Sequence, residues 1–137
     1  MAEGVIERWS AAAAALALLA GCSSEPVMQV SNQISSFVSG KGAPALSAGI
    51  RQFEEGEYPE ATKSLSSALE LGLSSTSDLA KAHKYLAFIH CVSNRVQQCR
   101  DEFARALDSS PSMDLPPSEA GHPIRGPVFK SVKATRR

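Results

Sequence analysis

Apolar residues recur every three to four positions along most of residues 45–107, which is the spacing of helices that bury one face. Four such stripes follow one another. They consist of Leu46, Ile50 and Phe53; Ala61, Leu65, Ala68, Leu69 and Leu71; Leu79, Ala82, Leu86, Ile89 and Val92; and Val96, Cys99, Phe103, Ala106 and Leu107. Turn residues at 56–59 and 93–95 separate the two members of each pair. The pattern predicts an all-α domain that contains two helical hairpins over residues 45–114.

The two predicted hairpins share one spacing, because six positions of the first recur in the second at an offset of 38 residues. Gly49, Gly56, Tyr58, Ala61, Leu65 and Ala68 correspond to Ala87, Asn94, Val96, Cys99, Phe103 and Ala106, and Pro111 closes the second unit. This pattern resembles the tetratricopeptide repeat. The resemblance implies that small residues at 49 and 61, and at 87 and 99, let the two helices of each hairpin approach closely.

The chain also departs from that repeat. The usual period is about 34 residues, so the extra length lies in the connection at 72–77, and Leu73 stands where a closing proline is expected. Two repeats need a cover at their open end. We expect residues 115–137 to form this C-terminal cap, with Ser118 as the N-cap of a short helix. After Gly126 and Pro127, the residues Val128, Phe129 and Val132 form one apolar face.

The N-terminal region carries a targeting pattern. Residues 10–20 form an uncharged apolar run, which as a helix reaches roughly 16 Å, about half of a hydrocarbon core. This length suits the hydrophobic region of a secretory signal. The sequence Leu19-Ala20-Gly21-Cys22 follows directly and resembles the lipobox of bacterial lipoproteins. The resemblance implies that residues 1–21 are removed and that Cys22 is acylated, which is the one cofactor-like group that we expect.

Two features qualify the location and the tether. Glu3 and Glu7 depart from the excess of positive charge that secretory signals usually carry before the apolar run. The alternative to a lipoprotein signal is a cytosolic Ala-rich helix with an incidental cysteine. Ser23 stands where Asp favours inner-membrane retention, so the lipobox resemblance implies an outer-membrane protein that faces the periplasm. Residues 22–44 contain many Ser, Gly and Pro residues and predict a flexible tether. A short amphipathic helix within residues 26–38 is the alternative.

The charge balance limits the classes of partner. Fourteen Lys and Arg residues against fourteen Asp and Glu residues give a formal net charge of zero, which excludes the strongly basic domain of a nucleic-acid-binding protein. Charged residues at 20% and hydrophobic residues at 43% exclude a wholly disordered chain. After Glu119 the chain is one-sided, with Arg125, Lys130, Lys133, Arg136 and Arg137 and no acidic residue. These either complement a helix dipole or contact an anionic lipid or an acidic partner.

Few residues have a pattern that points to catalysis. The soft-ligand group is His83, His90, Cys91 and Cys99, but it lacks the spacing of a zinc site, and we expect no metal. His122 lies between Gly121 and Pro123 and is expected to bond to the backbone of a turn. The acidic pairs at 54–55 and 101–102 are expected to be solvated helix faces. With neither a nucleophile motif nor a phosphate loop in the sequence, we expect neither an enzyme nor a small-molecule substrate.

The two remaining cysteines leave two alternatives. Export to an oxidising compartment permits a disulfide between Cys91 and Cys99, which lie on either side of the turn near Asn94. Their unequal distances from that turn place the Cα separation near the upper limit of about 7 Å. In the competing interpretation, Cys99 is only the small residue of the helix crossing and Cys91 is a free thiol in the core.

Three segments, 83–91, 99–103 and 119–129, are together similar to a group of small proteobacterial tetratricopeptide lipoproteins. Within this group the chain resembles the TssQ family, which is associated with type VI secretion, and the resemblance covers about residues 45–133. Its most distinctive part is Glu119-Ala120-Gly121-His122-Pro123-Ile124-Arg125-Gly126-Pro127-Val128-Phe129. The resemblance implies an accessory, envelope-anchored protein without an assigned activity.

We therefore expect a lipid-anchored periplasmic adaptor that binds another envelope protein through the groove of its hairpins. The alternatives are a lipoprotein of pilus or outer-membrane-protein assembly, and a structural scaffold close to the peptidoglycan.

The anchor leads to a first testable prediction. Replacing Cys22 by Ser removes the thiol that accepts the lipid, and acyl chains contribute about 0.8 kcal/mol of membrane affinity per buried methylene. The variant is therefore expected to accumulate as an unprocessed or soluble form, measured by membrane fractionation and intact mass. A variant that fractionates with membranes like the wild type, in the absence of a lipid mass shift in either protein, would contradict the anchor.

Overall fold

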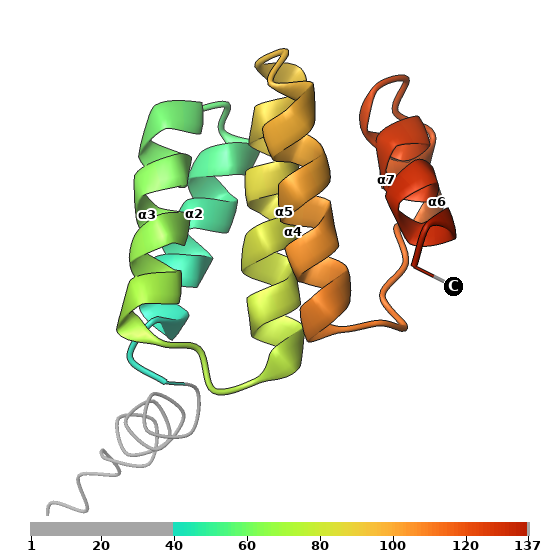
Figure 1. Cartoon of the computed structure of the whole chain (residues 1–137). Helices are drawn as coiled ribbons and strands as arrows, with labels where there is room; N and C mark the ends of the chain where they lie inside the picture. Colours follow the sequence, from blue (N-terminus) through green and yellow to red (C-terminus); the bar gives the residue numbers. More distant parts are fainter. Residues whose placement is uncertain (1–39, 137) are drawn as a thin grey trace, which may run out of the picture.

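The computed structural model describes residues 40–136, and in this part of the chain six helices pack in antiparallel pairs (Figure 1). They are α2 (Ala43–Glu54), α3 (Tyr58–Leu71), α4 (Thr76–Val92), α5 (Val96–Ser109), α6 (Pro117–Ala120) and α7 (Arg125–Ala134). The expectation of an all-helical domain with two long hairpins is confirmed. The predicted signal segment, Cys22 and the tether up to residue 39 lie outside the described residues.

The pairs stand side by side in chain order, with α2 and α3 at one edge, α4 and α5 in the middle, and α6 and α7 at the other edge (Figure 1). Helix α4 packs against both helices of the preceding pair, more extensively on α3 than on α2. Helix α7 repeats this relation, since it packs more extensively on α5 than on α4. The segment predicted to cap the second hairpin thus lies beside α5.

Local sequence explains several of the helix ends. Pro59 lies in the first turn of α3, where its missing N–H costs nothing, and Gly56 and Asn94 adopt left-handed conformations with φ of 81° and 58°. Asn94 therefore has the turn conformation that the sequence predicts. The hydroxyl of Ser75 caps α4 by accepting a hydrogen bond from the amide of Asp78 at 3.0 Å.

The predicted cap at Ser118 is wrong. Helix α6 begins after Pro116, which takes the N-cap position with no side-chain cap hydrogen bond, and Ser118 lies inside the helix. The extended conformation that Pro116 adopts before a following proline sets the start of the helix two residues earlier than predicted.

The core consists of two adjoining clusters of buried residues. The first contains Leu46, Ala61, Leu65, Ala68, Ala82, Leu86 and Ile89, and the second contains Ala87, Phe88, Cys91, Cys99, Phe103, Leu107, Leu115, Phe129 and Val132. Two members of the predicted stripes are exposed instead, Leu71 at 51% and Val96 at 43%. They are the last residue of α3 and the first residue of α5.

Small residues lie where the helices of the two hairpins approach each other. Ala61, Ala87 and Cys99 have no exposed surface. A Cβ atom on Gly49 would lie 2.7 Å from Cγ of Leu65, so the close approach of α2 to α3 depends on a glycine at that position.

Of the two alternatives for the cysteines, the structure contains the disulfide. Cys91 on α4 and Cys99 on α5 are bridged, with their Cα atoms 5.1 Å apart. A loop of eight residues closed by a disulfide contributes about 2–3 kcal/mol through the unfolded chain. Because disulfides persist mainly in oxidising compartments, the bridge fits a location outside the cytoplasm.

Across residues 40–136, none of the helices combines the length and the apolar character needed to cross a bilayer.

The seam between α6 and α7 provides the second prediction. A Cβ atom on Gly126 would collide with the carbonyl oxygen of Ala120, and this backbone atom cannot turn aside as a side chain can. We expect Gly126→Ala to lower the free energy of unfolding by about 1–3 kcal/mol, measured by thermal or denaturant unfolding.

Gly121→Ala is the matched control, because its Cβ would approach the oxygen of Pro117 only to 3.2 Å. Equal stability of the Gly126 variant and the wild type would mean that α6 and α7 do not pack as described.

Candidate functional site

Charged and aromatic side chains from four helices meet on one side of the domain. This cation–aromatic cluster consists of Phe53 from α2, Lys84, Tyr85 and Phe88 from α4, Glu119 from α6 and Arg125 from α7. It brings together segments that lie far apart in the sequence. It links the first helix pair to the second, and the second pair to the third. We regard it as the candidate functional site.

Three rings form the apolar part of the cluster. The ring centroids are 5.2 Å apart for Phe53 and Tyr85, 5.8 Å for Tyr85 and Phe88, and 5.9 Å for Phe53 and Phe88. Such tilted and edge-to-face pairs contribute about 0.5–1.5 kcal/mol each beyond the area that they bury. Phe88 is 1% exposed, whereas Phe53 and Tyr85 are half-buried and reach the surface.

Lys84 ties α4 to α6 across these rings. Its Nζ donates to both carboxylate oxygens of Glu119 at 2.9 Å, and it lies 4.9 Å from the ring centroid of Tyr85 and 5.3 Å from that of Phe88. The two side chains of the ion pair are only 15% and 21% exposed. The positive charge of Lys84 is therefore already matched by a carboxylate inside the domain.

Arg125 lies over two of the three rings from α7. The central carbon of its guanidinium lies 4.3 Å from the ring centroid of Phe88 and 6.0 Å from that of Phe53, which is within the range of cation–π attraction. Its Nε atom is buried without a hydrogen-bond partner. In contrast to Lys84, Arg125 forms no ion pair with any residue in the described range.

The electrostatics of the cluster act on Tyr85. Burial raises the pKa of its hydroxyl, the carboxylates of Glu119 and Glu54 raise it further, and the charge of Arg125 opposes them. Tyr85 thus remains a neutral hydroxyl at physiological pH. It can donate or accept a hydrogen bond at the edge of the cluster.

His122 fixes the start of α7, and with it the position of Arg125. Its Nδ1 accepts hydrogen bonds from the amides of Ile124 at 3.2 Å and of Arg125 at 3.4 Å. Its carbonyl oxygen accepts from the amide of Gly126 at 3.1 Å. The expectation that His122 bonds to the backbone of a turn is confirmed.

A second polar group lies between α4 and α5. Nδ1 of His83 is 2.7 Å from one carboxylate oxygen of Glu102, and Arg105 donates to the other at 2.5 Å. Burial would raise the pKa of Glu102, but the hydrogen bond and charge of His83, together with Arg105, outweigh burial, so that the pKa of Glu102 is lowered.

Glu102 is only 8% exposed, so the predicted solvated face at 101–102 is wrong for Glu102. The reason is the facing helix α4, which covers it. The pair at 54–55 is exposed as expected.

The residues that the sequence suggested as soft metal ligands, His83, His90, Cys91 and Cys99, have separate environments in the structure. His83 bonds to Glu102, and both sulfurs are consumed by the disulfide. Burial, followed by the charge of Arg95, lowers the pKa of His90, whose Nδ1 is buried without a partner. Within residues 40–136, no three His, Cys, Asp or Glu residues are arranged so that they could hold a metal ion.

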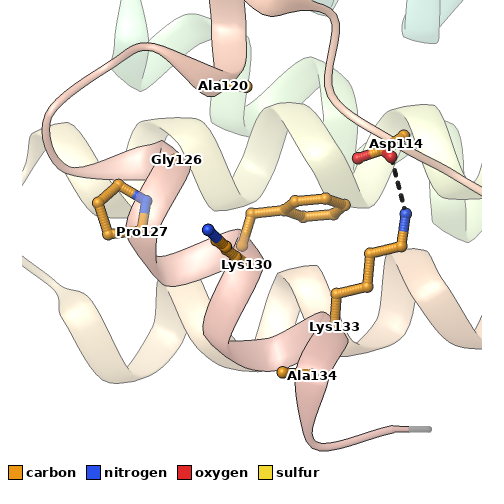
Figure 2. Close-up of a pocket in the computed structure, with 8 residues that line it drawn as sticks. Asp114, Ala120, Gly126, Pro127, Lys130, Lys133 and Ala134 are labelled. Carbon is orange, nitrogen blue, oxygen red and sulfur yellow. Dashed lines mark ion pairs between the residues drawn. The ribbon is translucent and has the colours of Figure 1, made fainter.

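A cleft of about 740 Å³ opens on α7 (Figure 2). It is lined by Asp114, Ala120, Gly126, Pro127, Phe129, Lys130, Lys133 and Ala134. Nζ of Lys133 is 3.0 Å from a carboxylate oxygen of Asp114 and donates to the carbonyl of Met113 at 3.0 Å, and Arg136 pairs with Asp108. Two of the basic residues after Glu119 are thus balanced by carboxylates of the domain itself.

Comparison with known proteins adds no relative. No protein-family model matches the sequence, and no curated protein or solved structure matches it significantly.

Sequence reasoning missed most of the cation–aromatic cluster. The predicted stripe of α4 omits Lys84, Tyr85 and Phe88, although Phe88 is one of the most buried side chains. The signal that could have identified it is the continuous apolar run at 85–89, because a helix that is apolar on several sides packs against more than one neighbour.

The buried carboxylate provides the third prediction. A carboxyl group whose pKa is lowered on folding stabilises the native state above its unfolded pKa, and this contribution is lost as the pH falls through the folded pKa. Glu102→Gln should therefore reduce the free energy of unfolding by about 1–3 kcal/mol at neutral pH. The difference from the wild type should shrink as the pH falls below the ordinary value of 4.5, measured by urea unfolding at several pH values.

The exposed Glu70, replaced by Gln, is the control and should show a difference close to zero at every pH. A Glu102 variant whose deficit stays constant down to acidic pH would show that the charge of Glu102 does not contribute to stability.

Proposed function

We propose that this protein is a lipid-anchored adaptor of the bacterial periplasm, built on two tetratricopeptide-like hairpins, and that it binds another envelope protein as an accessory of type VI secretion. The lipobox resemblance at Cys22 and the Cys91–Cys99 disulfide support export. The repeated spacing of 38 residues and the repeated packing of α4 and α7 on the pair before each support the helical-repeat assignment.

The cation–aromatic cluster is the observation that carries the proposed binding function. Protein interfaces are enriched in aromatic residues and arginine, and a few such side chains supply most of the binding energy. Phe53, Tyr85 and Arg125 lie together at the surface of three helices, on a floor formed by Phe88. The cluster offers a charged and apolar contact surface of the kind that a protein partner buries.

The proposed anchor limits where the partner lies. About twenty residues separate Cys22 from the start of α2 at Ala43. A flexible chain of that length has an end-to-end distance of roughly 25 Å and a fully extended limit of about 70 Å. The domain would therefore search a layer within tens of ångströms of the membrane, where envelope assemblies present their periplasmic parts.

Site-specific photocross-linking in cells tests this function. The full chain would carry p-benzoylphenylalanine in place of Glu54, an exposed residue whose charge acts on Tyr85. The matched control carries it in place of the exposed Lys63 on α3. We expect an adduct with an envelope protein at position 54 but not at 63, identified by mass spectrometry.

The identity of the captured protein separates the alternatives. A type VI secretion component supports the proposal, whereas a component of pilus or outer-membrane-protein assembly would replace it by that function. Adducts at neither position, or peptidoglycan as the sole bound material, would contradict the adaptor function.

A further inference from the structure

We propose that Arg125 binds a side-chain carboxylate, from Asp or Glu, of the partner protein. This inference rests on the proposed adaptor function and names the chemistry by which the cation–aromatic cluster recognises its partner. It depends on the unpaired state of Arg125, on the rings that hold it, and on the occupied amides at the start of α7.

The guanidinium of Arg125 is the unmatched charge of the cluster. Lys84 is bonded by both oxygens of Glu119, while Arg125 has neither an ion pair nor a side-chain hydrogen bond among residues 40–136. Its Nε is buried, but its two terminal nitrogens are not among the buried unpartnered atoms. Those two nitrogens are therefore accessible, and a carboxylate can accept two parallel hydrogen bonds from them, end on.

The surroundings prepare Arg125 for this contact. Its position over the rings of Phe88 and Phe53 restricts the side chain before binding, so less conformational entropy is lost when a ligand arrives. The aromatic floor also excludes water from one side, which strengthens an ion pair relative to one in bulk solvent. Glu54 carries a negative charge nearby, but it is exposed and forms no ion pair with Arg125.

The geometry favours a side-chain carboxylate over the end of a protein chain. Terminal carboxylates are commonly captured by free backbone amides. At the start of α7, however, the amides of Ile124 and Arg125 already donate to His122, and the amide of Gly126 donates to the carbonyl of the same residue. The guanidinium therefore remains as the donor group at this place.

The first test follows Arg125 directly in the acylated mature chain, held in detergent micelles and labelled with ¹⁵N-arginine. It is titrated with N-acetylglutamate α-methylamide, and in separate arms with N-acetylalanine, which offers a chain-end carboxylate, and with the neutral glutamine analogue. We expect a saturable shift of the Arg125 terminal nitrogens and of the Phe88 ring signals with the glutamate compound. N-acetylalanine should bind several-fold more weakly, and the neutral compound should give no saturable shift.

Two variants make the test specific. Arg125→Lys keeps the charge but loses the planar pair of donors, and the half-saturating concentration read from the Phe88 ring should rise about tenfold. Lys130→Gln removes an exposed positive charge of the same helix and should leave the titration unchanged. Thermal unfolding of both variants, expected within a few degrees of the wild type, establishes that they are folded.

Several results would overturn the proposal. They are an Arg125 signal that does not respond, equal responses to the glutamate and neutral compounds, tighter binding of N-acetylalanine, and an unchanged titration in Arg125→Lys.

Photocross-linking with Arg125→Lys separates this inference from the adaptor function. An adduct at position 54 that forms as well in the variant as in the wild type overturns the role of Arg125 and supports the adaptor. A carboxylate response of wild-type Arg125 without any cellular adduct supports the site chemistry and contradicts the adaptor.

Discussion

The contacts of one ring, that of Phe88, hold the two hairpins and the C-terminal helix together. Its centroid lies 5.9 Å from that of Phe53 on α2 and 5.9 Å from that of Phe103 on α5, and Arg125 of α7 covers it at 4.3 Å. Phe103 in turn meets Phe129 of α7 at 5.2 Å. A path of rings therefore runs through the domain from α2 to α7, and residues with 0–1% exposure lie at its centre. Because a short helical domain has little core to spare, these contacts decide whether its three pairs act as one unit.

Small residues and the disulfide allow the rings to meet. Gly49 leaves room for Leu65, and Gly126 leaves room for the carbonyl of Ala120. The Cys91–Cys99 bridge then ties α4 to α5 at their shared turn. These contacts act on α2 and α3, on α6 and α7, and on α4 and α5, so each of the three helix pairs has its own close contact.

Sequence reasoning succeeded where the deciding interaction is local. The helical period and the turns near Gly56 and Asn94 each depend on a few neighbouring residues, and all agree with the structure. It failed where a distant helix decides the outcome. Glu102 lies on a polar stretch of sequence but is buried against α4, where its carboxylate pairs with His83 and Arg105. Lys84 and Arg125 make their contacts only when α6 and α7 pack against α4. No local spacing in the sequence indicates that packing.

The side chains of the candidate site are also those that hold α6 and α7 against α4. Lys84 and Glu119 hold α6 against α4, and Arg125 joins α7 to the ring of Phe88. A ligand that binds only when these elements are docked stabilises the docked state, by an amount that grows with its concentration relative to its dissociation constant. In the proposed adaptor, a partner carboxylate on Arg125 would therefore tighten the packing of α7 on the second hairpin. Weakening that packing would lower the apparent affinity for the partner by the fraction of molecules in which α7 remains docked.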